Sequence, residues 1–230
     1  MNPLLSVIIP ARNEAQALPL LLADLAALRE AGAELLLVDG GSSDASLELA
    51  AGHVDRLLSC AAGRARQMNA GAAAATGDYL WFVHADTRVN PEAIRGLLDV
   101  LIERPLWGRF DVRLSARGAM FRLIGSMISL RSRLSGIASG DQGIFVARAT
   151  FEALGGYADI PLMEDLELCR RLKRLAWPCC LRPALTTSSR RWEQQGIWRT
   201  LLLMWRLRLA YYCGVSPEKL ARQYQRGAPP

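Results

Sequence analysis

The stretch that decides the fold reads Leu5-Ser-Val-Ile-Ile-Pro-Ala-Arg-Asn-Glu14. Its apolar run over residues 5–9 is typical of a strand buried on both faces, and Pro10 ends the run because proline cannot donate to a sheet ladder. Leucines then recur at three- and four-residue intervals over residues 18–28, which indicates a helix with one apolar stripe. The chain therefore begins with a strand followed by a helix.

The same alternation continues along the first hundred residues. Apolar runs typical of buried strands occupy residues 35–38, 54–59 and 79–83, and helical segments begin near Ala45, Arg64 and Pro91. This pattern predicts an α/β fold with a mostly parallel, Rossmann-like central sheet and helices on both faces. In such sheets ligands bind beyond the carboxyl ends of the strands.

The second half changes character and is less regular. The pattern predicts strands over residues 110–114 and 143–146, and helices over 118–135, over 151–154 and from residue 164. We expect the last 35 residues to form two helices separated at residues 214–217.

Length and composition narrow the class of protein. With 230 residues, 51% of them hydrophobic, the chain fits one large domain or one domain with a terminal extension. Five cysteines without C-x-x-C spacing argue against a disulfide framework or a structural zinc site. We see no secretory signal, and arginines interrupt the apolar stretch of 197–213, so we expect a cytoplasmic protein. The net charge of +6 comes without a nucleic-acid recognition motif, so no nucleic-acid partner is expected.

Acidic residues gather where the expected strands end. Glu14 follows the first strand, Asp39 ends the second, and Asp86 follows the fourth. Carboxylates collected on one rim repel each other unless a cation compensates. A divalent metal that holds a diphosphate is a natural resolution, because Mg²⁺ prefers one or two carboxylates together with phosphate oxygens.

Four segments together resemble family 2 glycosyltransferases of the GT-A fold. They are Ser6-Val-Ile-Ile-Pro-Ala-Arg-Asn-Glu14, Val38-Asp-Gly-Gly-Ser-Ser-Asp44, Gly77-Asp-Tyr-Leu-Trp-Phe-Val-His-Ala-Asp-Thr87 and Met163-Glu-Asp-Leu-Glu167. Within that family, His84-Ala-Asp86, Gly140-Asp-Gln142 and Ser189-Arg-Arg-Trp192 resemble a bacterial subgroup described as selenodomain-associated or linked to arsenosugar biosynthesis.

The resemblance implies a nucleotide-sugar donor, with uracil as the usual base. Pro10, Asn13 and Glu14 match the segment that lines the nucleoside pocket, and Asp39 matches the carboxylate that binds the base. The structural alternatives are that Asn13 and Glu14 start a helix and that Asp39 is a turn aspartate before two glycines.

The resemblance also implies a metal site for Mn²⁺ or Mg²⁺. His84-Ala-Asp86 matches a D-x-D motif in which the last aspartate binds the metal that bridges the two donor phosphates. Histidine replaces the first aspartate here; it can ligate Mn²⁺, hydrogen-bond the donor, or be a structural residue at a strand end.

Glu164 and Asp165 match the acidic pair that supplies the general base for an inverting transfer. Asp165 matches the usual base and Glu164 is the alternate. The structural alternative is helix capping, since a carboxylate is stabilised at a helix N-terminus whatever its function.

Further residues complete the expected site. Arg64 resembles a donor-contacting arginine, with a solvated arginine as the alternative, and we expect Asp141 and Gln142 on the acceptor side. Arg190 and Arg191 are expected to reach the diphosphate from a loop.

The domain organisation follows from these assignments. We expect a catalytic domain over 1–190, with a nucleotide-sugar half (1–105) and an acceptor half (106–190), and a helical extension over 191–230. Aromatic residues and arginines alternate among leucines over 196–213, which suits packing on the domain, a homodimer contact, or a peripheral contact with the inner face of the membrane. The last would suit a lipid-linked acceptor, and a small molecule is the other acceptor class.

The expected function is transfer of a sugar from a nucleotide-sugar to an acceptor hydroxyl. A sugar nucleotidyltransferase is a second reading, but Ala11-Arg-Asn-Glu14 lacks the glycine-rich loop expected there. A catalytically silent sugar- or nucleotide-binding module is a third, and the retained Asp39, Asp86 and Asp165 argue against it.

Overall fold

Strand β1 (Leu5–Ala11) occupies the parallel part of the central sheet, and all seven of its residues are buried. The computed structural model describes residues 3–226. β1 pairs in parallel with β2 (Glu34–Asp39) on one side and with β4 (Tyr79–Phe82) on the other. Both faces of β1 are covered, which explains why its sequence is continuously apolar rather than alternating.

The sheet has seven strands in the order β3-β2-β1-β4-β6-β5-β7. β6 runs antiparallel to β4 and to β5, and the other pairs are parallel. This mixed, mostly parallel arrangement confirms the predicted α/β fold class. The remaining strands are β3 (Arg56–Ser59), β5 (Trp107–Leu114), β6 (Phe145–Ala147) and β7 (Cys179–Thr187).

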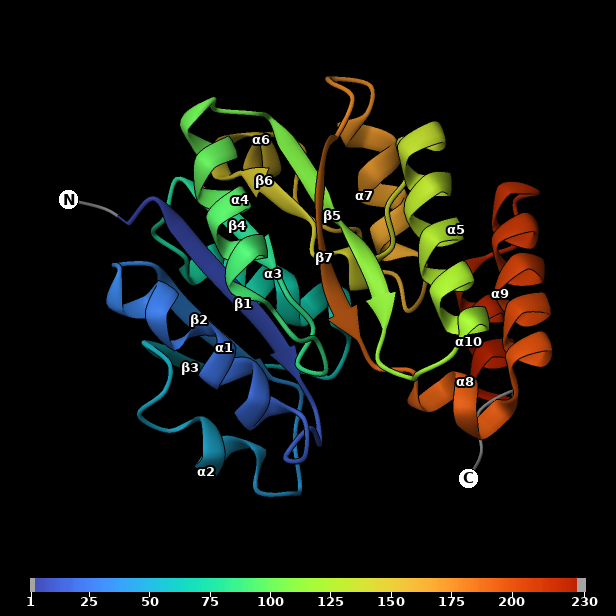
Figure 1. The fold of residues 1–230 in the computed structure, drawn as a ribbon, viewed down its shortest axis with the longest axis horizontal. Helices are drawn as coiled ribbons and strands as arrows, with labels where there is room; N and C mark the ends of the chain where they lie inside the picture. The colour runs from blue at the N-terminus through green and yellow to red at the C-terminus, as the bar shows by residue number, and fades with distance from the viewer. Residues whose placement is uncertain (1–2, 227–230) are drawn as a thin grey trace.

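Helices cover both faces of this sheet (Figure 1). Along β1, Val7 and Ile9 belong to a buried cluster with leucines of α1, whereas Ile8 belongs to a second cluster with α3, α7 and two C-terminal helices. The helices are α1 (Leu18–Glu30), α2 (Ser46–Ala50), α3 (Arg64–Ala74), α4 (Pro91–Ile102), α5 (Ala119–Ser135), α6 (Arg148–Ala153), α7 (Glu164–Leu172), α8 (Arg190–Gln195), α9 (Ile197–Tyr212) and α10 (Pro217–Arg226).

The C-terminal region differs from the prediction. It contains three helices rather than two, because Gly196 adopts a φ of 83° that a helix cannot contain and so separates α8 from α9. None of the helices within residues 3–226 is both long and apolar enough to cross a bilayer.

Strand β7 was absent from the sequence prediction. It lies at the sheet edge in parallel with β5, and its register shifts between Phe110 and Asp111. Arg182 and Pro183 interrupt its apolar pattern. A proline in a strand is tolerated at an edge, where no ladder partner needs its missing N–H.

Glycine at position 71 allows α3 to approach the sheet closely. A Cβ at this position would lie 2.5 Å from Cγ2 of Ile8 and 3.0 Å from Cγ2 of Val38. Both side chains are fully buried and have little room to move.

We therefore expect Gly71→Ala to lower the free energy of unfolding, because overpacking a close contact costs about 1–3 kcal/mol. Gly96→Ala in α4 is the matched control: its Cβ would lie 3.4 Å from Pro183, an ordinary contact, and the gain in helix propensity is about 1 kcal/mol. Urea denaturation followed by circular dichroism measures both variants. A Gly71→Ala variant as stable as Gly96→Ala would contradict the packing argument.

Candidate active site

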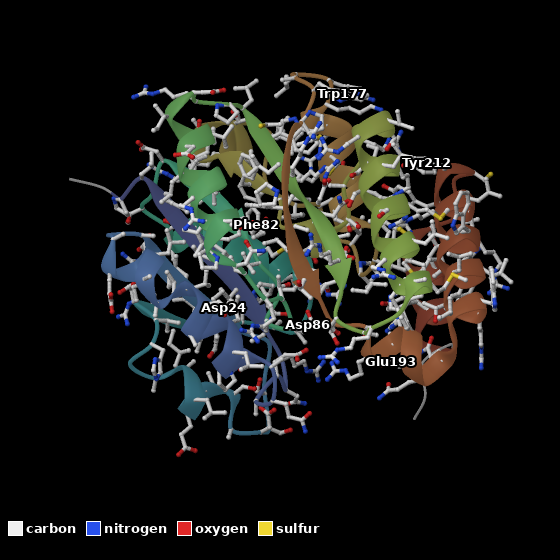
Figure 2. All side chains as sticks on the ribbon, viewed as in Figure 1. Asp24, Phe82, Asp86, Trp177, Glu193 and Tyr212 are labelled. Carbon is white, nitrogen blue, oxygen red and sulfur yellow. The ribbon has the colours of Figure 1, made fainter. Side chains whose placement is uncertain are left out.

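A cavity of about 1090 Å³ opens beyond the carboxyl ends of β1 and β4. Its walls come from α3, α5, α7 and the C-terminal helices α8, α9 and α10, so residues far apart in the sequence meet around it. In Figure 2, Asp86 lies at the edge of the sheet that faces α8. This is the position at which open α/β sheets bind ligands.

Most of the site residues expected from the sequence lie on this cavity. Ten of them line it: Pro10, Glu14, Arg64, His84, Asp86, Asp141, Glu164, Asp165, Arg190 and Arg191. Asn13, Asp39 and Gln142 do not line it.

Asp39 is 3% exposed, and its carboxylate holds the turn that follows β2. It accepts hydrogen bonds from the backbone N–H groups of Gly41, at 2.9 Å, and Ser42, at 3.1 Å. Asn13 joins the neighbouring loop to this turn, because its Oδ1 accepts a hydrogen bond from the Ser43 N–H at 2.8 Å. The structure therefore gives Asp39 the turn contacts of its structural alternative. Asn13 does not start a helix, because α1 begins at Leu18; its side chain instead joins the loop after β1 to the turn after β2.

Asp141 and Gln142 are adjacent in sequence but face opposite ways. They lie in a short 3₁₀ turn, Gly140–Gln142, which directs Asp141 to the cavity and Gln142 into the core. Gln142 is fully buried, and its amide donates to Oγ of Ser132 at 2.9 Å. Gln142 therefore does not line the cavity, and its amide holds α5 against the turn that carries Asp141; its expected role in shaping the acceptor side stays a prediction.

The two acidic residues at the start of α7 differ in their surroundings. Asp165 is half-buried, and its Oδ2 accepts the Gly140 N–H at 2.7 Å, which fixes the carboxylate against the 3₁₀ turn. Glu164 is only 5% exposed. Burial and the neighbouring Asp165 raise the pKa of Glu164 to about 7, although Arg64 opposes the shift. The pair therefore carries a proton that can be exchanged near neutral pH.

His84 is held in its neutral form, because burial and the charge of Arg64 lower its pKa. Its imidazole packs against Gly140, where a Cβ would lie 2.8 Å from Nε2. A neutral imidazole retains a lone pair and can act as a metal ligand.

A metal at this site would need ligands from its substrate. The part of the chain that the structure describes holds no group of three or more His, Cys, Asp or Glu residues that could bind a metal ion. His84 and Asp86 offer two protein ligands on the cavity wall. The Asp86 carboxylate suits Mg²⁺ or Mn²⁺ together with substrate phosphates and water, whereas an imidazole ligand at His84 suits Mn²⁺ better than Mg²⁺.

Arginines from the C-terminal segment meet the acidic rim across the cavity. Arg190 Nη2 lies 3.9 Å from Glu14 Oε2, which connects α8 to the loop after β1. Burial raises the pKa of Glu14, and Asp86 raises it further, whereas Arg190 and Arg64 lower it. The guanidinium of Arg191 stacks over the Tyr224 ring, 3.9 Å from its centroid. Carboxylates and guanidinium groups thus share one pocket without full mutual pairing.

Three arginines that line the cavity were not among the site residues predicted from the sequence: Arg12, Arg131 and Arg208. Arg131 projects from α5 and Arg208 from α9, and both line the cavity. The sequence does not single out either residue, because other arginines lie two positions away, Arg133 from Arg131 and Arg206 from Arg208.

The comparisons with known proteins agree with this architecture. The sequence matches the family "Glycosyl transferase family 2" over residues 6–151. No match was found among curated proteins.

Solved structures resemble the fold at low sequence identity. S. aureus TarS 1–349 in complex with UDP is 16% identical, with a TM-score of 0.64 over 82% of this chain and 60% of that chain. Glucosyl-3-phosphoglycerate synthase from Mycobacterium tuberculosis in complex with Mn²⁺, UDP and glucosyl-3-phosphoglycerate is 20% identical, with a TM-score of 0.56 over 80% of this chain and 70% of that chain. The present chain thus spans less than two thirds of the TarS 1–349 chain.

At these identities the structural likeness concerns the fold alone. The family match, in contrast, extends over more than half of the sequence. The chain belongs to glycosyl transferase family 2, and its α/β fold is GT-A-like.

Proposed function

We propose that this enzyme transfers a sugar from a UDP-linked donor to an acceptor hydroxyl, with inversion and with the help of Mn²⁺ or Mg²⁺. The observation that carries the proposal is the single cavity where Asp86, Glu164 and Asp165 meet Arg64 and Arg190. Relatives of the same fold were solved with UDP, with UDP-GlcNAc, and with Mn²⁺ and UDP-glucose, which supports the choice of donor and metal.

The donor is proposed to lie over the ends of β1, β2 and β4. Pro10 and Glu14 would line the nucleoside pocket, with Asn13 and Asp39 shaping its floor through the turn they hold. An ionised carboxylate can accept about four hydrogen bonds. We therefore propose that Asp39 accepts one from the base in addition to those from its own turn. Arg64 and Arg190 would face the diphosphate, and Arg191 would complete that side.

Asp86, with His84 beside it, is proposed to hold the divalent cation. When bound, the cation would neutralise the two phosphates of the leaving group. The lowered pKa of His84, caused by burial and by Arg64, keeps the imidazole available as a ligand or a hydrogen-bond partner.

Asp165 is proposed to take the proton of the acceptor hydroxyl, with Glu164 as the alternate. The acceptor oxygen forms a bond to the anomeric carbon while the bond from that carbon to the diphosphate breaks, and the proton moves to the carboxylate. The hydrogen bond from the Gly140 N–H orients Asp165 on the same side as Asp141.

The wider assignments are proposals that depend on the same site. We assign 1–190 to catalysis, in halves 1–105 and 106–190, and 191–230 to a helical extension; the last strand ends at Thr187, which supports the boundary. The selenodomain-associated or arsenosugar-type subgroup stays a proposal that rests on the three short motifs given above. A cytoplasmic location is proposed with it.

Helix α9 is the segment proposed for a peripheral membrane contact, with a homodimer as the alternative use of the same face. Five large apolar or aromatic side chains at three- and four-residue spacing are exposed on it: Trp198, Leu202, Trp205, Leu209 and Tyr212. An exposed apolar face of this kind marks an interaction site.

Asp86→Asn should weaken binding of a UDP-sugar in the presence of Mn²⁺ by about tenfold or more, because a ligand of the diphosphate-bound cation is lost. Binding in EDTA should be unchanged. Asp99→Asn, at an exposed position on α4, is the matched control. Isothermal titration calorimetry with and without Mn²⁺ measures both, and equal Mn²⁺-dependent affinity in Asp86→Asn and wild type would refute the assignment.

Asp165→Asn should retain donor affinity and slow transfer by roughly 100-fold or more, since the amide cannot accept the proton. Donor hydrolysis with Mn²⁺, followed as release of UDP, measures the rate before the acceptor is known. Absence of donor hydrolysis in the wild type, both with and without Mn²⁺, would favour the silent binding module. A normal rate in Asp165→Asn would place the base elsewhere.

The rate of wild-type hydrolysis should rise between about pH 6 and pH 8, because Glu164 is neutral below its pKa and ionised above it. Ionised Glu164 either accepts the proton itself or adds negative charge beside Asp165. Glu164→Gln should abolish this rise, as the amide does not titrate. An unaltered pH profile in Glu164→Gln would show that another group controls the rate in this range.

A further inference from the structure

The outer part of the cavity lies between α5 and α9, which run side by side in Figure 1. Its walls are mainly apolar and come from both helices: Met127, Ile128, Leu130 and Leu134 of α5, and Leu201, Met204 and Trp205 of α9. Several of these side chains are largely exposed, including Leu134 at 73% and Trp205 at 62%. Large apolar side chains collected along a solvent-accessible cleft indicate a ligand with an apolar part.

Arg131 and Arg208 are the charged residues on these two walls. Nε and Nη2 of Arg131 and Nε of Arg208 are buried and have no hydrogen-bond partner among the described residues. Each buried donor left unsatisfied is unfavourable, and a guanidinium has no means of losing its charge. An anion placed between the two helices would satisfy donors of both.

The electrostatics of Arg131 agree with this geometry. Burial and the nearby Arg208 lower its pKa to about 10, and Asp141 and Asp165 oppose the shift. Two guanidinium groups therefore repel each other at this position, and the carboxylates that act on Arg131 belong to the side of the proposed base.

The position of the pair separates it from the donor. The diphosphate is assigned to Arg64, Arg190 and Asp86, at the ends of β1 and β4. Arg131 and Arg208 lie instead on α5 and α9, among the apolar side chains of the outer part of the cavity. An anion bound at Arg131 would therefore belong to the acceptor.

We infer that Arg131 and Arg208 form an anion subsite for the acceptor, which is a phosphate ester that carries the acceptor hydroxyl and a hydrocarbon chain, and that this chain lies between α5 and α9. The inference rests on the proposed glycosyl transfer, since it names the class of acceptor for the same cavity. Phosphate offers several acceptor oxygens for two guanidinium groups, and the apolar walls account for the chain.

Alkyl phosphates test the subsite without knowledge of the natural acceptor. Titration calorimetry compares decyl phosphate, octyl phosphate, inorganic phosphate and the uncharged decyl maltoside, each below its critical micelle concentration. Decyl phosphate should bind most tightly, with at most about fourfold in affinity for each methylene that becomes buried. Inorganic phosphate binding as tightly as decyl phosphate would overturn the hydrocarbon part, and decyl maltoside binding as tightly would overturn the anion part.

Variants locate the site. Arg131→Gln and Arg208→Gln should each weaken decyl phosphate at least tenfold, and Arg131→Lys should retain part of the affinity. Arg122→Gln on α5 and Arg206→Gln on α9 are matched controls at exposed positions outside the cavity lining, and they should stay within twofold of wild type. Equal affinity in Arg131→Gln, Arg208→Gln and the controls would overturn the assignment.

UDP binding with Mn²⁺, measured on the same variants, separates this inference from the proposed function. It should be unchanged in Arg131→Gln and Arg208→Gln, which also shows that they are folded. A wild-type protein that binds decyl phosphate through these arginines but does not bind UDP would refute the donor assignment and leave the anion subsite standing. The reverse result, UDP binding without binding of decyl phosphate, would overturn the subsite alone.

Discussion

Parallel pairing around a fully buried β1 is the constraint on which the rest of the structure depends. Because β2 and β4 run in the same direction on either side of it, the three strands end at the same edge of the sheet. The pairing of Ala11 with Asp39 brings the loops after β1 and β2 together. A chain with an antiparallel strand in this position would send one of these loops to the opposite edge, and no common cavity would form there.

The electrostatics of the cavity follow from this convergence. Several carboxylates are confined in a half-buried space, and arginines from the C-terminal helices enter the same space without pairing fully with them. Glu14 and Glu164 both respond with raised pKa values, for which burial is the main cause in each case. In such a pocket the guanidinium groups can bind anionic oxygens of a ligand, and the carboxylates with raised pKa values can exchange a proton with it.

Much of the fold could be predicted because the strands of the first half are buried on both faces and are therefore continuous apolar runs. The acidic residues of the rim could be placed for the same reason, as they directly follow those strands. Strand β7 could not, because Pro183 and Arg182 at a sheet edge break the apolar pattern. The separation of α8 from α9 depends on the φ of a single residue, Gly196, within a sequence that otherwise reads as helical.

The direction in which individual side chains point was harder to predict than the positions of the helices and strands. Asp141 and Gln142 face opposite ways because they lie in a 3₁₀ turn, and the spacing of apolar residues does not predict this turn. The Asp39 carboxylate faces the backbone N–H groups of its own loop. Arg131 and Arg208 lie near each other because α9 and α5 line the same cavity. The spacing of apolar residues within each helix does not predict this tertiary arrangement. Membership in glycosyl transferase family 2 supports the prediction that the acidic residues after the parallel strands belong to the site. The roles of single residues remain predictions.

Gly140 connects the two sides of the cavity through one peptide. Its N–H binds the Asp165 carboxylate at 2.7 Å, and its Cα faces the imidazole of His84 so closely that a Cβ would lie 2.8 Å from Nε2. No side chain cushions this contact, so a shift of the 3₁₀ turn would displace both neighbours together. A side chain at position 140 would therefore push the imidazole away and disturb the turn that orients the Asp165 carboxylate.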